Sequence, residues 1–233
     1  MTSNDFIIFG VGQAVPLTIS NLVLWLRADS IGGIADGDPL PSWMDISRFE
    51  NHAVAPSPGE RPILRMGILN GKPVVRFDGV NDNLIVTGLG TVEFSGVTEG
   101  TMFVVFGPTA TNYTVIGFGA ADSYWRFSGD GKGYIGEFRA VRQEAQPSSG
   151  QPTSGYHYHT IRSGPASGYE YRQNGVIAFD GTPDWGVPAD LEVGGNALNP
   201  FTGDIAEVIV YAAELSDIQV EAVEAYLATR WGL

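Results

Sequence analysis

The sequence contains no cysteine in its 233 residues and only three histidines. A disulfide framework and a thiolate metal site are therefore excluded, and the fold must be stabilised by burial of apolar side chains. A three-histidine metal site would need every histidine of the chain at one point. The scarcity of both residue types argues against zinc chemistry.

Basic residues are also few, with 13 Lys and Arg against 26 Asp and Glu, a formal charge of -13. Such a surface repels phosphate backbones and anionic lipid head groups, so we expect neither nucleic acid nor membrane as a partner. The acidic residues are scattered along the chain. This pattern is typical of a solvated surface, with cation binding as the alternative.

Long hydrophobic runs are missing as well. The first ten residues have no basic n-region, and their apolar run, Phe6, Ile7, Ile8 and Phe9, is too short for a signal peptide or a membrane span. The glycines and Pro16 that follow this run are typical of an arm ahead of a domain. We therefore assign residues 1–18 to an N-terminal arm and 19–233 to one domain.

Glycine (31) and proline (14) are abundant, and they separate short runs of apolar residues. This spacing predicts an all-β domain of about a dozen strands in two packed antiparallel sheets. The unbroken run from Leu22 to Leu26 predicts a strand buried on both faces. The Asp130-Gly131 pair predicts a tight hairpin, and the polar stretch 145–155 an exposed loop. The core is expected to include Trp25, Trp43, Phe77, Phe103 and Ile209.

Helical spacing appears only at the end of the chain. Ser216 and Gln219 form a capping-box pattern, and Gly232 suits a left-handed C-cap. The apolar stripe between them is Val220, Val223, Leu227 and Trp231. We expect one C-terminal helix that covers an open end of the sandwich, with Glu221 and Glu224 on its solvated face.

Several stretches resemble the LamG-like jelly-roll domains of bacterial and phage type, within the concanavalin A-like class. They occur in the same order as in that family: Leu24–Asp29, Trp43 with Asp45, Leu69–Asp82, Phe201–Tyr211 and Tyr226–Leu233. The resemblance implies a two-sheet jelly-roll sandwich. This fold hosts lectins, adhesion modules, enzymes and virion components alike, so it does not by itself decide function.

Catalytic patterns are absent where the fold class would place them. Glycosidases of this class carry Glu-Xaa-Asp-Xaa-Xaa-Glu along one strand, and the chain has no such run. His157 and His159 point the same way on a presumed strand, but no third metal ligand is near in sequence. We expect both imidazoles on an exposed face beside Arg162.

Asp78, Asn81 and Asp82 offer hard oxygen ligands within five residues, at a turn that LamG-like domains often use for calcium. The alternative is an Asx-turn, in which Asp78 and Asn81 bond to their own backbone. Calcium is the one cofactor that the sequence suggests.

Aromatic residues offer stacking surfaces for sugar rings. The candidate ligand-binding residues are Tyr124, Trp125, Tyr156, Tyr158, Tyr169 and Tyr171. A period of two places both tyrosines of each strand pair on one face, which either lines a concave sheet or packs under a loop.

These features favour a non-catalytic binding or structural module, with a phage head or tail accessory protein as its setting and the virion or extracellular space as its location. We expect virion or surface proteins, or glycans, as partners. The arm at Phe6–Phe9 either folds back or pairs with a neighbouring subunit to form an oligomer. The alternative is a polysaccharide hydrolase or lyase with an unrecognised active site.

Overall fold

The computed structural model describes residues 15–111, 113–118, 124–127, 133–137, 142–145, 154–182, 185, 190–196 and 199–233. For residues 91, 124–127, 133–137, 142–145, 196 and 199 it describes the backbone alone. The predicted arm at Phe6–Phe9, the Asp130-Gly131 hairpin and the side chains of Tyr124 and Trp125 lie outside the described part.

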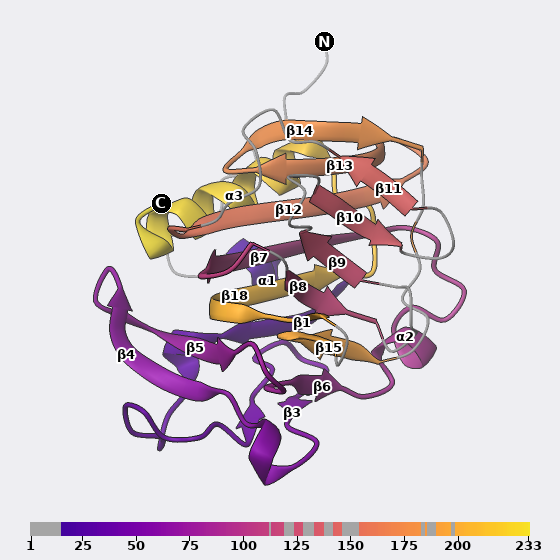
Figure 1. Ribbon diagram of the computed structural model, residues 1–233. Coiled ribbons are helices and arrows are strands. Elements are labelled where there is room, and N and C mark those ends of the chain that lie inside the picture. Colours follow the sequence, from indigo (N-terminus) through magenta and orange to yellow (C-terminus); the bar gives the residue numbers. More distant parts are fainter. Residues whose placement is uncertain are drawn as a thin grey trace.

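The described chain forms two large antiparallel sheets, as the sequence predicts (Figure 1). Sheet A consists of β1 (Leu22–Arg27), β4 (Ile63–Leu69), β5 (Lys72–Asp78), β7 (Gly100–Pro108), β12 (His157–Gly164), β13 (Gly168–Gln173), β14 (Val176–Gly181) and β18 (Thr202–Tyr211). Its order is β14-β13-β12-β7-β18-β5-β4, and β1 also pairs with β18.

Sheet B has the order β11-β10-β9-β8-β15-β6-β3-β2. It consists of β2 (Ser42–Trp43), β3 (Ala53–Val54), β6 (Leu84–Val86), β8 (Tyr113–Gly117), β9 (Tyr124–Phe127), β10 (Gly133–Glu137), β11 (Arg142–Ala145) and β15 (Leu191–Val193). A small ribbon pairs β16 (Gly195–Asn196) with β17 (Asn199–Pro200).

The helical elements are few among the described residues. They are α1 (Val15–Thr18), η1 (Ala28–Ser30), η2 (Pro58–Glu60), α2 (Leu89–Val92) and α3 (Asp217–Trp231). Only α3 exceeds one turn, so the prediction of one substantial helix at the C-terminus is confirmed. No helix in the described chain is both long and apolar enough to cross a bilayer.

The core lies between the two sheets and continues under α3. All five predicted core residues are at most 1% exposed: Trp25, Trp43, Phe77, Phe103 and Ile209. The first five residues of β1 are buried on both faces, which confirms the interpretation of the unbroken apolar run. Asn70 and Gly71 both have positive φ, at 49° and 78°, as a two-residue hairpin turn requires.

Helix α3 begins at its predicted capping box, where the Ser216 N–H donates to Oε1 of Gln219 at 3.0 Å. It ends at Gly232, whose φ of 70° lies in the left-handed region. Its position differs from the prediction. It packs across the outer face of sheet A, the face turned away from sheet B, rather than over an open end (Figure 1). Tyr226, Glu224 and Trp231 contact β1, β12 and β18 there, in that order.

A buried carboxylate joins α3 to sheet A. Glu207, on β18, is 0% exposed and accepts hydrogen bonds from the indole N–H groups of Trp25 (2.5 Å) and Trp231 (2.6 Å). The Tyr226 hydroxyl donates a third at 2.9 Å. Burial raises the pKa of Glu207 to about 7, while the three donors act in the opposite direction. We call these four residues the Glu207 latch.

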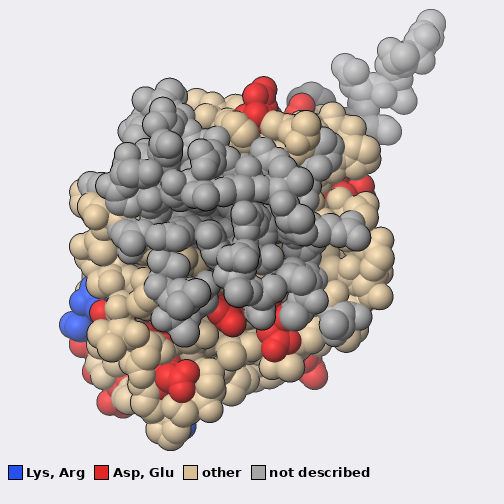
Figure 2. All heavy atoms as spheres, turned by 45° about the vertical axis from the view of Figure 1, so that its right-hand side comes forward, with Lys and Arg blue, Asp and Glu red and all other residues tan. Residues whose placement is uncertain are grey.

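Charged side chains are spread over the surface. On the face that Figure 2 shows, acidic groups form small separate patches and outnumber the basic ones. This agrees with the scattered acidity of the sequence.

Candidate binding groove

An open groove of about 700 Å³ lies on the outer face of sheet A, between α3 and the strands β12, β13 and β14. Its charged lining consists of Arg162, Glu170, Arg172, Glu214, Asp217 and Glu221. Ile177 and Leu215 supply apolar contacts. We call this feature the α3–β14 groove.

Strand register places the charged floor of the groove. Arg162 on β12 pairs with Glu170 on β13, and Thr160 pairs with Arg172. Because side chains alternate along a strand, all four point to the outer face, and their neighbours point inward. The charged floor therefore forms because β12 and β13 both carry polar residues at every second position.

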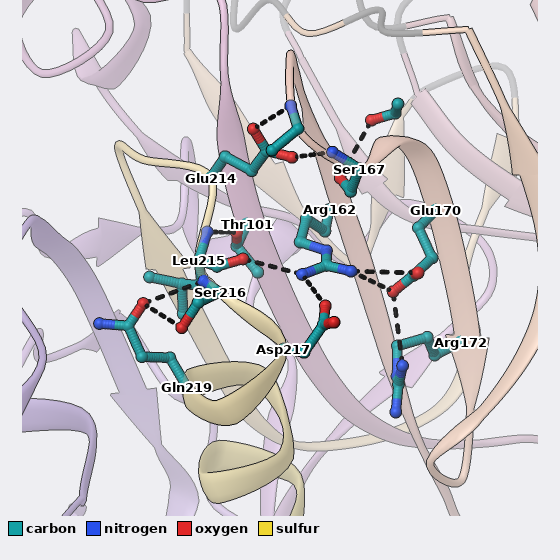
Figure 3. Close-up of polar contacts among 12 residues, drawn as sticks. Thr101, Arg162, Ser167, Glu170, Arg172, Glu214, Leu215, Ser216, Asp217 and Gln219 are labelled. Atoms are coloured by element: carbon teal, nitrogen blue, oxygen red, sulfur yellow. Dashed lines mark hydrogen bonds and ion pairs between the residues drawn. The ribbon is translucent and has the colours of Figure 1, made fainter. Parts of the chain in front are cut away.

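The charged groups of the floor form ion pairs, and Figure 3 shows those of Glu170 with Arg162 and Arg172. Arg162 donates from one terminal nitrogen to both oxygens of Glu170, each at 3.1 Å. Arg172 donates two hydrogen bonds to Glu224 of α3, at 2.9 and 3.1 Å. The Thr160 hydroxyl donates to the same carboxylate. Each of these four charged residues is at most 8% exposed. The floor therefore carries two arginines and two glutamates, each of which is paired with a residue of opposite charge.

This arrangement corrects one prediction. Glu224 was expected on the solvated face of the helix, yet it is 4% exposed. The Glu224 carboxylate points toward sheet A, because Arg172 and Thr160 donate hydrogen bonds to it there.

The rim of the groove is acidic. Asp217 accepts a bond from Arg162 at 2.7 Å, although its side chain is 76% exposed. Glu214 accepts the backbone N–H groups of Ala166 and Ser167. Burial works against ionisation of Glu214, but these hydrogen bonds outweigh it and lower its pKa. Glu221 is exposed on the first turns of α3.

The predicted tyrosines fall into two groups. Tyr169 and Tyr171 are 0% exposed and face sheet B, so the prediction that they bind a ligand is wrong. Their side chains fill the core because β13 presents its polar residues to the outer face. Tyr156 and Tyr158 are partly exposed. The Tyr156 hydroxyl donates to Asp204 at 2.5 Å.

The histidine prediction also needs correction. His157 and His159 do share a face, with ring centroids 6.0 Å apart. That face is the inner one: His159 is 0% exposed, stacks on Phe106 at 4.5 Å and lies 2.6 Å from the Tyr171 hydroxyl. Burial holds its pKa well below the usual value. Arg162 lies on the opposite face.

The turn at Asp78 is closed by its own backbone. Oδ1 of Asp78 accepts from the N–H groups of Val80 (2.8 Å) and Asn81 (3.3 Å), and Oδ2 of Asp82 accepts from Asp78 N–H (2.9 Å). The Asn81 amide donates to Gly59 O. No group of three or more acidic or histidine side chains able to hold a metal occurs in the described residues. Calcium at this turn stays a prediction.

We predict that Asp82→Asn raises stability above about pH 6 in metal-free buffer. Burial first, and then the charge of Asp78, raise the pKa of Asp82 to about 6. The wild type therefore loses stability as pH rises from about 4 to about 6, by about 1 to 2 kcal/mol after solvent screening, and the amide removes that loss. Thermal melts at pH 5 and 8 measure it, with Asp38→Asn as control. If, in calcium-containing buffer at pH 8, Asp82→Asn melts below the wild type and a chelator abolishes the difference by lowering the wild type, the turn instead binds calcium.

The groove was missed at the level of sequence. Its signal was present in part, since Thr160 with Arg162 and Glu170 with Arg172 are polar pairs two residues apart, on strands β12 and β13 of the structure. Their partners on α3 and in the loop before it are more than 40 residues away, and only the fold brings them together.

No family model matches the chain, and no curated protein matches it in sequence. Solved structures share its fold. A Trypanosoma rangeli sialidase in complex with sialic acid has a TM-score of 0.63 at 12% identity over 92% of this chain. The receptor binding domain of botulinum neurotoxin D has a TM-score of 0.64 at 12% identity over 94%.

This chain spans about a third of the sialidase (34%) and about half of the neurotoxin domain (56%). At this identity the likeness establishes the β-sandwich fold alone. The structures of similar fold therefore include one described as a binding domain and one described as a sialidase.

Proposed function

We propose that this protein is a non-catalytic module that binds a protein or a glycan through the α3–β14 groove. The observation that carries this proposal is a division of the ionisable groups. At the groove, Glu170, Glu214 and Glu224 are paired with arginine or with backbone N–H groups. Among the described residues, the acids whose pKa burial raises lie outside the groove lining, at Glu207, at Asp82 and at Glu192 on β15 of sheet B.

This division matters because a hydrolase or lyase needs a proton donor with a raised pKa facing the substrate. Glu207 is fully buried in the latch, and Asp82 caps its own turn. In the groove, hydrogen bonds keep Glu214 ionised. Side chains held in ion pairs and hydrogen bonds suit recognition rather than proton transfer.

The alternative function, a polysaccharide hydrolase or lyase, would draw on His159 and Tyr171. They form a hydrogen-bonded pair with shifted pKa values, and a lyase mechanism uses such a pair for proton transfer. Both side chains are 0% exposed, however, and burial is the main cause of both shifts. The burial of both side chains favours a role in core packing over a role in catalysis.

We retain the LamG-like relationship and the phage accessory role, in the virion or the extracellular space, as parts of this proposal. They are supported by the ordered motifs from Leu24 to Leu233 and by the β-sandwich fold. Immunogold labelling of particles from the source culture tests the setting, and unlabelled particles would remove it.

The proposal predicts that Ala166→Trp abolishes binding without unfolding the protein. Ala166 is an exposed residue of the groove, so an indole there fills the space at little energetic cost. We expect the wild type to bind members of an array of neutral and charged oligosaccharides and peptides, and to release no product from the corresponding polysaccharides. The variant should lose at least tenfold in affinity at an unchanged melting temperature.

Two results would contradict the proposal. One is undiminished binding by Ala166→Trp, which would move the site away from the groove. The other is a new reducing end or an unsaturated product, which would establish the enzyme.

A further inference from the structure

The two ends of sheet A differ in how their outer edges are covered. At β4, the chain itself supplies cover: Gly37 N–H donates to Leu64 O at 2.7 Å, and Leu64 N–H donates to Asp38 O at 3.1 Å. Pro39 also forms a bridge with Ile63. At the other end, β14 pairs with β13 alone among the described residues. Figure 1 shows β14 as the outermost strand.

The β14 edge carries exposed apolar side chains next to the groove. Val176 is 66% exposed and Ile177 is 51% exposed. Ile177 pairs with Arg172 and lines the groove. An unpaired strand edge with exposed β-branched residues is the arrangement that accepts an additional strand through main-chain hydrogen bonds.

The charge beside this edge is negative. Asp180 on β14 is exposed and lies opposite Glu170 in the register. Glu221 and Asp217 extend the acidic rim along α3. Both groove arginines are already paired with carboxylates. An approaching segment therefore meets Asp180 and Glu221, which form no ion pair with another described residue, in a chain whose formal charge is -13.

Among the residues that the structure describes, the groove lining offers no aromatic ring, and Ile177 and Leu215 are its large apolar residues. A sugar ring would find nothing to stack on, whereas a peptide strand needs only the open backbone edge and charged neighbours. The observations thus favour a protein segment over a glycan.

We propose that an extended, basic segment of a partner protein adds to β14 as a further strand of sheet A. Alternate side chains of that strand lie on the outer face, where its lysine or arginine groups meet Asp180 and the acidic rim. Its apolar residues lie on the opposite face, beside Val176, and the stems of its basic side chains lie beside Ile177. This inference rests on the proposed binding function and names the chemistry of the partner.

The test uses the full chain and a fluorescein-labelled peptide of alternating sequence, Lys-Val-Lys-Val-Lys-Val-Lys, in fluorescence anisotropy. A second peptide carries N-methyl groups on its valines, which removes main-chain donors and keeps every charge. The double variant Asp180→Lys with Glu221→Lys reverses two acids of the site. Asp38→Lys, on the covered β4 side, together with Asp36→Lys, is the charge-matched control.

We expect the N-methylated peptide to bind about tenfold more weakly, because strand addition depends on the main chain. The double variant should also lose about tenfold and the control less than twofold. Equal binding of both peptides, equal losses in variant and control, or no binding would overturn the proposal.

A separate binding experiment distinguishes this inference from the proposed binding function. If chitohexaose or another neutral oligosaccharide binds the wild type and fails to bind Ala166→Trp, the protein-segment inference is overturned and the binding module stands. If Ala166→Trp retains all binding, the module proposal fails as well.

Discussion

Replacing Glu207 by alanine is expected to lower the free energy of unfolding by about 4 kcal/mol, because it leaves buried donors without an acceptor and opens a small cavity. The indole N–H groups of Trp25 and Trp231 both donate hydrogen bonds to this carboxylate, and both tryptophans are at most 1% exposed. Water does not reach them, so nothing replaces the lost bonds. Chemical denaturation followed by tryptophan fluorescence measures the effect, with Asp38→Ala as the exposed control.

The pH dependence of this effect has a defined sign. The pKa of Glu207 is raised in the folded state from 4.5 to about 7, so wild-type stability declines as pH rises through that interval. The alanine variant lacks this decline. Its deficit against the wild type should therefore be larger near pH 5 than near pH 8. A deficit below about 1 kcal/mol at both pH values would remove the latch from the account of stability.

Truncating Trp25 to alanine is expected to lower the free energy of unfolding by about 3 to 5 kcal/mol. The side chain is 1% exposed, contacts the Tyr226 ring edge-on at 6.1 Å and donates to Glu207. The substitution removes both the packing and one donor of the latch. Urea unfolding measures the loss.

Trp25→Phe separates the two contributions. It keeps most of the packed volume and removes the indole donor, so we expect a loss of about 1 to 2 kcal/mol. Unchanged unfolding in Trp25→Ala would show that α3 and β1 do not depend on this contact.

Local patterns in the sequence predicted much of the fold. The run at Leu22–Leu26 identified β1 because a strand covered on both faces needs unbroken apolar residues. Ser216, Gln219 and Gly232 marked the ends of α3, since caps act through neighbouring backbone groups. Strand β4, at Ile63–Leu69, was missed. Met66, Gly67 and Ile68 are exposed in succession, which breaks the alternation that identifies a strand.

Burial of polar residues was harder to predict, because it depends on partners distant in the sequence. Glu224 looks like a solvated helix residue until Arg172 is placed beneath it, 52 positions earlier in the chain. His159 looks like an exposed imidazole until Phe106 and Tyr171 enclose it. A period of two correctly put His157 and His159 on one face, but it did not say which face meets the core.

The groove follows the same rule. The sequence supplies its alternating polar residues on β12 and β13, whereas register and the position of α3 decide that Arg162, Glu170 and Arg172 share one surface. The aromatic residues led the ligand prediction toward Tyr169 and Tyr171, because their spacing is the same whether they face solvent or the core.

Hydrogen–deuterium exchange tests the central claim, binding at the α3–β14 groove, most directly. The full chain is compared with and without the saturating alternating Lys-Val peptide, in the wild type and in Ala166→Trp. The account predicts slower exchange in the wild type at β14 (Val176–Gly181) and at residues 214–221, because β14 gains main-chain partners and the rim is covered. Ala166→Trp should show neither change. Protection confined to other elements, or the same protection in the variant, would contradict the account.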